Sequence, residues 1–97
     1  MIEYIHENDK LTCRFEGRWD TAKCQELERE ISDKISGVNT AVVFDLEKVR
    51  YVASAFLRIC LKTAKAAGER RFSVAGVSPE VKKVFKIAGF DKLMAIE

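Results

Sequence analysis

The sequence lacks any long hydrophobic segment and any strong excess of one charge. None of its apolar runs approaches the roughly 20 residues that a membrane-spanning helix needs. The first ten residues, MIEYIHENDK, carry acidic side chains where a signal peptide has an apolar segment. Seventeen basic and 15 acidic residues leave a net charge of +2, which gives no reason to expect a nucleic-acid partner. We therefore expect a cytoplasmic protein with no membrane partner and no nucleic-acid partner.

Residues suited to catalysis or metal binding are also scarce. His6 is the only histidine, and no cysteine stands near it at metal-ligand spacing. The three cysteines, Cys13, Cys24 and Cys60, form no C-x-x-C pair, and each is expected on an apolar face as a buried, reduced thiol. Neither a phosphate-binding P-loop nor a glycine-rich dinucleotide motif occurs. We expect no cofactor, no metal and no enzymatic activity.

The first part of the chain predicts a β-hairpin and then a helix. Residues 2–17 alternate apolar and polar side chains on both sides of the turn sequence NDK, and Gly17 is expected to end the second strand. A helix is predicted over 18–37, with Asp20 or Thr21 as its N-cap. Its expected buried residues are Cys24, Leu27, Ile31 and Ile35.

The second part predicts strands that alternate with helices. The expected elements are a strand at 40–46, a connector at 47–52, a helix at 54–68, a strand at 70–77, a helix at 78–90 and a short edge strand within 91–97. The first of these strands is almost continuously apolar, which is typical of a central strand covered on both faces, with Val42, Val43 and Phe44 buried. After the initial hairpin, this order predicts an α/β fold. We expect a mixed β-sheet of four to five strands with three main α-helices.

The last helix has the clearest end signals in the chain. Ser78 is the expected N-cap, Pro79 occupies the first helical position, and Gly89 follows the last turn. Its expected buried stripe consists of Val81, Val84, Phe85 and Ala88.

Three segments of the sequence resemble the STAS domain, the fold of the bacterial anti-sigma factor antagonists. They are FEGRWDTAKCQEL, VVFDLEKVRYVASAFLRIC and VAGVSPEVKKVFKIAGFDKLMAI, in the family's order and at its spacing. The resemblance implies a STAS-like single domain over residues 1–97. It also implies a partner of the anti-sigma factor and serine-kinase type. In such proteins, phosphorylation of the second hydroxyl residue in an Asp-Ser-Ser-Gly-Leu loop breaks the complex.

The chain departs from this family loop at three positions. Ala53 replaces the acid, Ala55 replaces the phosphoacceptor, and Phe56 replaces the glycine. Ser54 and Leu57 keep the first hydroxyl and the core anchor. Ser54 has two interpretations, a helix N-cap or a displaced phosphorylation site, and we favour the N-cap.

The resemblance places the partner-binding surface around this loop. On the predicted helix, Phe56 and Ile59 flank the buried stripe, so we expect them to be partly exposed, with Phe56 as an aromatic anchor. The expected partner-binding residues are Asp20, Thr21, Ala53, Ser54, Ala55, Phe56, Arg58 and Ile59.

The leading hypothesis is a non-catalytic protein-interaction module that resembles an anti-sigma factor antagonist and lacks the phosphorylation switch. The alternative is a STAS-type sensor of a small molecule or nucleotide. A regulatory domain fused to a transporter is disfavoured because the chain starts at a methionine and carries no membrane segment. The sequence leaves a weak homodimer open. Lysines on the last two helices are interpreted as solubilising residues: Lys62, Lys65, Lys82, Lys83 and Lys86.

Overall fold

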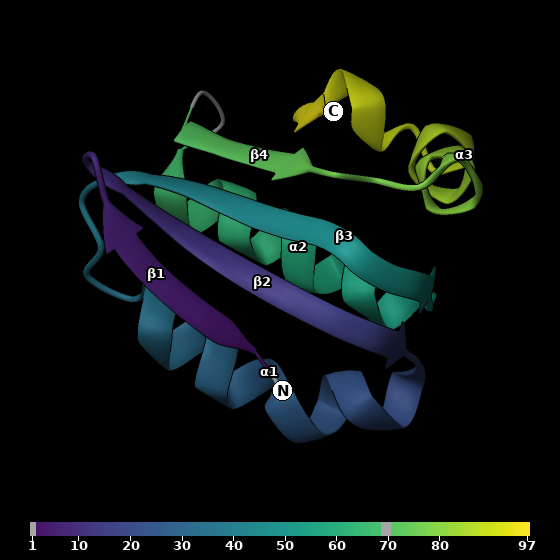
Figure 1. Ribbon diagram of the computed structural model, residues 1–97, viewed down its shortest axis with the longest axis horizontal. Helices are drawn as coiled ribbons and strands as arrows, with labels where there is room; N and C mark the ends of the chain where they lie inside the picture. Colours follow the sequence, from purple (N-terminus) through teal and green to yellow (C-terminus); the bar gives the residue numbers. More distant parts are fainter. Residues whose placement is uncertain (1, 69–70) are drawn as a thin grey trace.

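A computed structural model describes residues 2–68 and 71–97 and contains one five-stranded mixed sheet (Figure 1). The elements are β1 (Glu3–Glu7), β2 (Lys10–Trp19), α1 (Thr21–Ile35), β3 (Ala41–Val52), α2 (Ser54–Ala67), β4 (Phe72–Ala75), α3 (Pro79–Ile87), the 3₁₀ turn η2 (Phe90–Lys92) and β5 (Ala95–Ile96). The strands lie in sequence order, β1 pairs antiparallel with β2, and all later pairs are parallel. The predicted mixed sheet, its central strand β3 and the short edge strand are confirmed.

Helices α1 and α2 both lie on one face of the sheet, behind it in Figure 1. The burial pattern of β2 follows this arrangement, because Leu11, Cys13 and Phe15 are buried and the residues between them are not. In β3, Val42 and Phe44 are fully buried but Val43 is only half-buried. The expectation that β3 is covered on both faces is therefore wrong.

Helix α3 begins and ends at the predicted residues. The hydroxyl of Ser78 accepts a hydrogen bond from the Val81 amide at 3.3 Å, Pro79 is the first helical residue, and Gly89 adopts φ 79° after the helix. Val81 and Phe85 are buried against the core. The rest of the predicted stripe is exposed, namely Val84 and Ala88.

Strands β2 and β3 both run further than the sequence indicates. Strand β2 continues through Gly17, whose φ of +89° allows the chain to bend without ending the strand, and stops at Trp19. The register with β3 shifts between Arg14 and Glu16 and again between Gly17 and Arg18, and β3 has an extra residue at each shift. These are β-bulges, which increase strand twist and re-aim side chains.

The second half of β3 was predicted as a connector. Its buried residues are Leu46, Val49 and Val52, which are spaced by three positions, whereas a regular strand has a spacing of two. The two bulges account for this spacing, since each inserts one residue that does not point to the core. Residues 47–52 therefore continue the central strand towards the start of α2.

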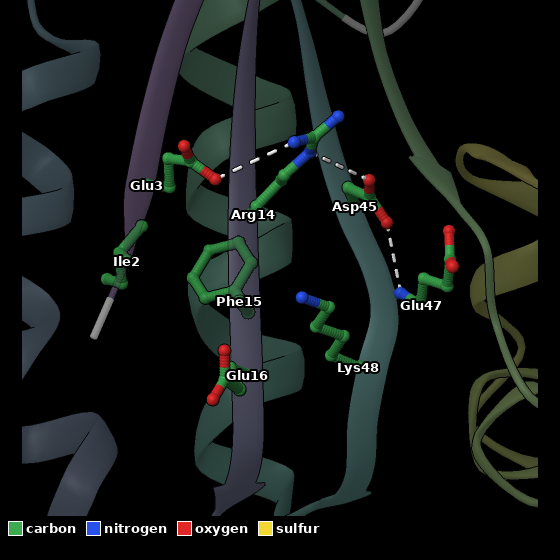
Figure 2. A pocket seen from close by; sticks show the side chains of 8 residues that line it. All are labelled: Ile2, Glu3, Arg14, Phe15, Glu16, Asp45, Glu47 and Lys48. Carbon is green, nitrogen blue, oxygen red and sulfur yellow. Dashed lines mark hydrogen bonds and ion pairs between the residues drawn. The ribbon is translucent and has the colours of Figure 1, made fainter.

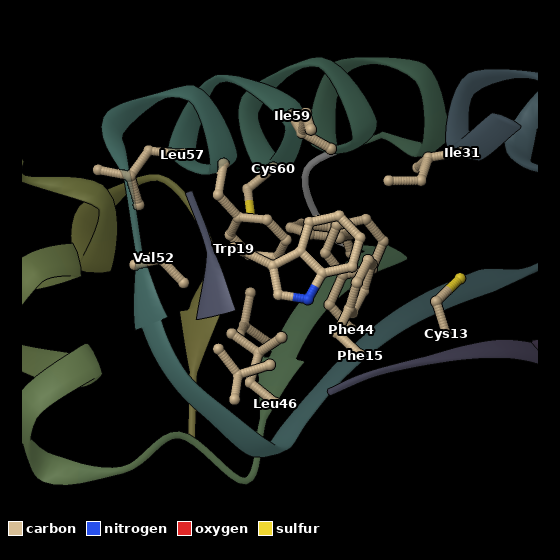
Figure 3. Packing of buried hydrophobic residues seen from close by; sticks show 14 of the residues in the cluster. Cys13, Phe15, Trp19, Ile31, Phe44, Leu46, Val52, Leu57, Ile59 and Cys60 are labelled. Carbon is tan, nitrogen blue, oxygen red and sulfur yellow. The ribbon is translucent and has the colours of Figure 1, made fainter. Parts of the chain in front are cut away.

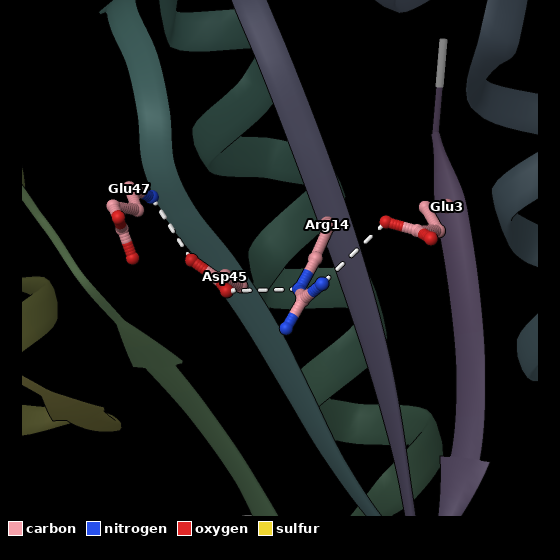
Figure 4. Close-up of polar contacts among 4 residues, drawn as sticks. All are labelled: Glu3, Arg14, Asp45 and Glu47. Atoms are coloured by element: carbon pink, nitrogen blue, oxygen red, sulfur yellow. Dashed lines mark hydrogen bonds and ion pairs between the residues drawn. The ribbon is translucent and has the colours of Figure 1, made fainter.

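A polar network lies at the first bulge on the open face of the sheet (Figure 4). The Arg14 guanidinium lies 3.6 Å from the Glu3 carboxylate and 3.4 Å from that of Asp45. Asp45 also accepts a hydrogen bond from the Glu47 amide at 3.0 Å, which holds the bulged backbone. Gly76 follows β4 and passes close to this bulge. A Cβ atom on Gly76 would lie 3.1 Å from Asp45 Oδ1 and 3.1 Å from the Glu47 backbone nitrogen, so the position requires glycine.

Four aromatic side chains form the centre of the core behind the sheet (Figure 3). Phe15 lies at the middle, with its ring centroid 5.0 Å from that of Trp19, 4.7 Å from that of Phe44 and 5.2 Å from that of Phe56. Phe56 is 0% exposed and Ile59 is 3% exposed, so the expectation that they are partly exposed is wrong. Phe56 is buried because α2 begins next to three aromatic rings of the strands, those of Phe15, Trp19 and Phe44.

The three cysteines are free and buried, as predicted from the sequence. Loss of contact with water raises the pKa of the Cys13 thiol from 9.0 to about 12. Burial also raises the pKa of Cys24 and of Cys60, the latter well above the ordinary value. All three thiols are therefore protonated at neutral pH and are poor nucleophiles.

We expect Phe56→Ala to lower the free energy of unfolding by about 3–5 kcal/mol, because it removes a fully buried ring and leaves a cavity. Chemical denaturation followed by circular dichroism measures this loss. Ile87→Ala is the matched control, since Ile87 is 78% exposed, and its effect should stay within about 0.5 kcal/mol. Equal effects of the two substitutions would contradict the burial of Phe56.

The raised pKa of Cys13 predicts a loss of stability in alkali. The thiol ionises from about pH 9 in the unfolded chain but only near pH 12 in the folded chain, so stability falls as pH rises through that window, by up to about 1.4 kcal/mol per pH unit. The difference in unfolding free energy between the wild type and Cys13→Ala should therefore shrink between pH 8 and pH 11 under reducing conditions. Leu11→Ala, at a neighbouring buried position, should keep a constant difference. A constant difference for Cys13→Ala as well would refute the pKa assignment.

Candidate functional site

Both covering helices begin at the same end of the sheet. Trp19 at the end of β2 pairs with Val52 at the end of β3, and the Ala53 amide donates a hydrogen bond to the Trp19 carbonyl at 2.9 Å. Because β2 and β3 are parallel, their carboxyl ends lie at the same end of the sheet. Helix α1 follows β2 and helix α2 follows β3, so both helices begin there. The structure thus brings Asp20 and Ser54, which are distant in sequence, to the same end of the molecule.

The start of α1 is held in place by two residues. Asp20, one of the two predicted candidates, is the N-cap, and its carboxylate accepts a hydrogen bond from the Lys23 amide at 2.9 Å. The ammonium group of Lys23 donates to the Glu16 carbonyl at 3.1 Å and lies 4.8 Å from the centroid of the Trp19 ring. Lys23 therefore ties the first turn of α1 to the end of β2. The side chains of Asp20 and Thr21 remain exposed.

The start of α2 differs from the sequence expectation by one residue. Ala53 is the N-cap, with φ −87° and ψ 167°, and it offers no side-chain cap. Ser54 is the first helical residue and is exposed, so its predicted role as the N-cap is wrong. The Ala53 amide is engaged in the pairing with β2, which keeps that residue extended and delays the helix.

The predicted binding residues divide into exposed and buried groups. Asp20, Thr21, Ser54 and Arg58 are exposed. The side chains of the other four point into the protein: Ala53 at 9% exposed, Ala55 at 7%, Phe56 at 0% and Ile59 at 3%. The expectation of one surface patch that includes Phe56 is therefore wrong, because Phe56 lies below the surface that Asp20 and Ser54 share.

The exposed aromatic residue at this end is Tyr51, which is not among the binding residues expected from the sequence. Tyr51 is 41% exposed, pairs with Arg18 across β2 and β3, and has the Arg18 guanidinium carbon 4.5 Å from its ring centroid. This stacking orients both side chains. Tyr51 stands three residues before Ser54, so its position in the sequence places it near this site. The direction of its side chain cannot be read from the sequence, because the second bulge of β3 changes the alternation of side chains there.

Metal-ligating side chains do not cluster at this end of the sheet in the part of the chain that the structure describes. Within residues 2–68 and 71–97, no group of three or more His, Cys, Asp or Glu side chains could hold a metal ion. His6 is exposed on β1. Cys24, in the first turns of α1, is buried with a raised pKa. What this end offers is a set of exposed polar and aromatic side chains on two helix starts and two strand ends.

A cavity of about 470 Å³ lies on the open face of the sheet, around the polar network of the first bulge (Figure 2). Its charged lining contains four carboxylates and two basic groups, and Arg14 is already paired with two of those carboxylates. An acidic lining of this kind disfavours a phosphate-bearing ligand. The residues around the cavity are Ile2, Glu3, Arg14, Phe15, Glu16, Asp45, Glu47 and Lys48.

In the part of the chain that the structure describes, every helix is too short or too polar to cross a membrane.

Comparison with known proteins identifies the family. A family model described as Mlab, STAS domain, matches residues 4–95. BtrV of Bordetella bronchiseptica, which is named as an anti-sigma factor antagonist, is 31% identical over 82 residues, covering 82% of this chain and 71% of its own. A STAS-domain containing protein of Pseudomonas aeruginosa is 29% identical over 92 residues, covering 93% of this chain and 90% of its own.

The fold agrees with solved structures. The crystal structure of an anti-sigma factor antagonist from Mycobacterium paratuberculosis matches with a TM-score of 0.87 and 21% sequence identity, covering 99% of this chain and 83% of that one. The order of strands and helices, the sequence match along almost the whole chain and the shared fold agree with one another. The chain belongs to the STAS domain family.

Proposed function

We propose that this chain is a non-catalytic module that binds an anti-sigma factor of the serine-kinase type in the cytoplasm, with residues 1–97 acting as one unit. The binding surface is the end of the sheet where α1 and α2 begin. The observation that carries the proposal is the 2.9 Å hydrogen bond from the Ala53 amide to the Trp19 carbonyl, which joins the two helix starts into one surface. The exposed members of that surface are Arg18, Asp20, Thr21, Tyr51, Ser54 and Arg58.

The chemistry of this surface suits a protein partner. Tyrosine and arginine are enriched at the energetic centres of interfaces, and here Tyr51 and Arg18 are already stacked on each other. Their pre-formed arrangement reduces the side-chain entropy that binding would otherwise cost. Asp20 contributes an exposed carboxylate at the start of α1. We expect the partner to present apolar surface to Tyr51 and an acidic group to Arg18.

Phosphorylation at the family position is not available to this chain. Ala55 has no hydroxyl that could accept a phosphate. Ser54 is the only hydroxyl residue in the segment ASAFL, and on a helix its side chain is turned about 100° from that of Ala55. Because Ser54 is not the N-cap, engagement of its hydroxyl in a cap does not protect it from a kinase. The proposal rests instead on the different direction in which Ser54 points. We propose binding that does not respond to the family switch.

This proposal predicts that the complex persists in ATP. The chain is incubated with ATP and each serine-kinase anti-sigma factor of the same genome, followed by intact-mass spectrometry and calorimetric binding. We expect one such protein to bind the wild type and to leave it largely unphosphorylated. Ala55→Ser should gain phosphate and lose affinity, whereas Ser54→Ala should remain unphosphorylated, as the wild type does. Phe56 is kept in every variant, since its ring fills the core.

Two results would contradict this account. Stoichiometric phosphate on wild-type Ser54 with release of the partner would show that the switch has moved by one residue and still operates. A failure of every serine-kinase anti-sigma factor to bind, with the wild-type chain folded, would refute the proposed partner class.

A further inference from the structure

Helix α3 carries an exposed surface that the proposed function does not use. Its inner side buries Val81 and Phe85, while Val84 is 36% exposed and Ile87 is 78% exposed. Val84 and Ile87 are three residues apart, so they are neighbours on the outer side of the helix. Helical spacing predicts that Val84 is buried, and its exposure leaves an apolar pair facing water.

Basic side chains lie beside this apolar pair. Lys83 stands four residues before Ile87 and Lys86 stands three residues after Lys83, so both belong to the same exposed turns. Neither lysine takes part in the three ion pairs found among residues 2–68 and 71–97. We call Lys83, Val84, Lys86 and Ile87 the α3 face.

The combination of charge and apolar surface restricts what can bind the α3 face. A second copy docked α3 to α3 would bring lysines against lysines, which is unfavourable. The exposed acidic side of α1 would match in charge, through Glu26, Glu30 and Asp33. This side of α1 has no exposed large apolar side chain that could cover Ile87. Among the described residues, the exposed large apolar side chains lie on β3, on α3 and just after η2: Tyr51, Val84, Ile87 and Leu93. This chain is therefore a poor partner for its own α3 face.

We propose that the α3 face docks an acidic amphipathic helix of another protein, with leucine-type side chains on Val84 and Ile87 and carboxylates on Lys83 and Lys86. A helix laid along an apolar stripe with charge pairs at its rim is a common mode of recognition. The α3 face shares no residue with the Tyr51 surface, so this proposal does not depend on the identity of the anti-sigma factor partner.

The test uses a short helical peptide of leucine and glutamate with leucines at i, i+3, i+4 and i+7. A titration into the ¹⁵N-labelled chain should give saturable NMR shifts of residues 83–88. Ile87→Ser should weaken binding about tenfold, through loss of apolar burial. The double variant Lys83→Glu, Lys86→Glu should weaken it as much, and more so at low salt. Lys65→Glu, an exposed lysine on α2, is the matched control and should leave binding unchanged.

Two further probes separate the alternatives. The same peptide with lysine in place of every glutamate should not bind, and vesicles of phosphatidylglycerol should not compete with the acidic peptide. Equal binding of the basic peptide, unchanged affinity of Ile87→Ser, or binding to vesicles without binding to the peptide would each overturn the proposal. In all three cases the binding of the anti-sigma factor partner is measured separately and its result stands.

Discussion

The packing of Phe56 against the rings of Phe15 and Trp19 is the contact on which the rest of the structure depends. It joins three elements, because Phe15 and Trp19 belong to β2, the adjacent Phe44 belongs to β3, and Phe56 belongs to the first turn of α2. The cluster therefore fixes where α2 starts relative to the strand ends. Phe56 is therefore a buried anchor for the first turn of α2.

This anchoring has a cost that the rest of the core offsets. The indole N–H of Trp19 is buried and has no hydrogen-bond partner within the described part of the chain, which costs about 1–3 kcal/mol. Burial of the large rings stabilises the fold by more than this amount, since each fully buried aromatic contributes about 1.5–3 kcal/mol or more. The core thus favours apolar contact over hydrogen bonding at the end of the sheet that carries the candidate site.

Local signals in the sequence predicted most of the fold. The alternation in Leu11, Cys13 and Phe15, and the caps at Asp20 and Ser78, act through neighbouring residues and are read directly from the chain. The second half of β3 could not be predicted in this way, because its two bulges replace the strand spacing of two by a spacing of three in Leu46, Val49 and Val52. Bulges depend on pairing with β2, and pairing is not a local property.

The starts of α1 and α2 meet at one end of the sheet, but the side chains exposed there differ from the expectation. Serine is a better N-cap than alanine by local preference, yet Ala53 takes that position because its amide pairs with the Trp19 carbonyl. Helical spacing predicts that Phe56 lies at the side of the buried stripe of α2. In the structure, residues near the ends of β2 and β3 pack against that side of the helix, so Phe56 is buried. Tyr51 was missed for the same reason. In each case a contact between distant segments overrides a local pattern.

We propose that the joined starts of α1 and α2 form the partner-binding surface. Amide hydrogen exchange measured by mass spectrometry, on the chain alone and in complex with the anti-sigma factor that binds it, tests this most directly. The account predicts slower exchange in two segments that are far apart in sequence, 18–23 and 51–58, with little change in β1. Unchanged exchange in both segments, while the complex is fully formed, would contradict it.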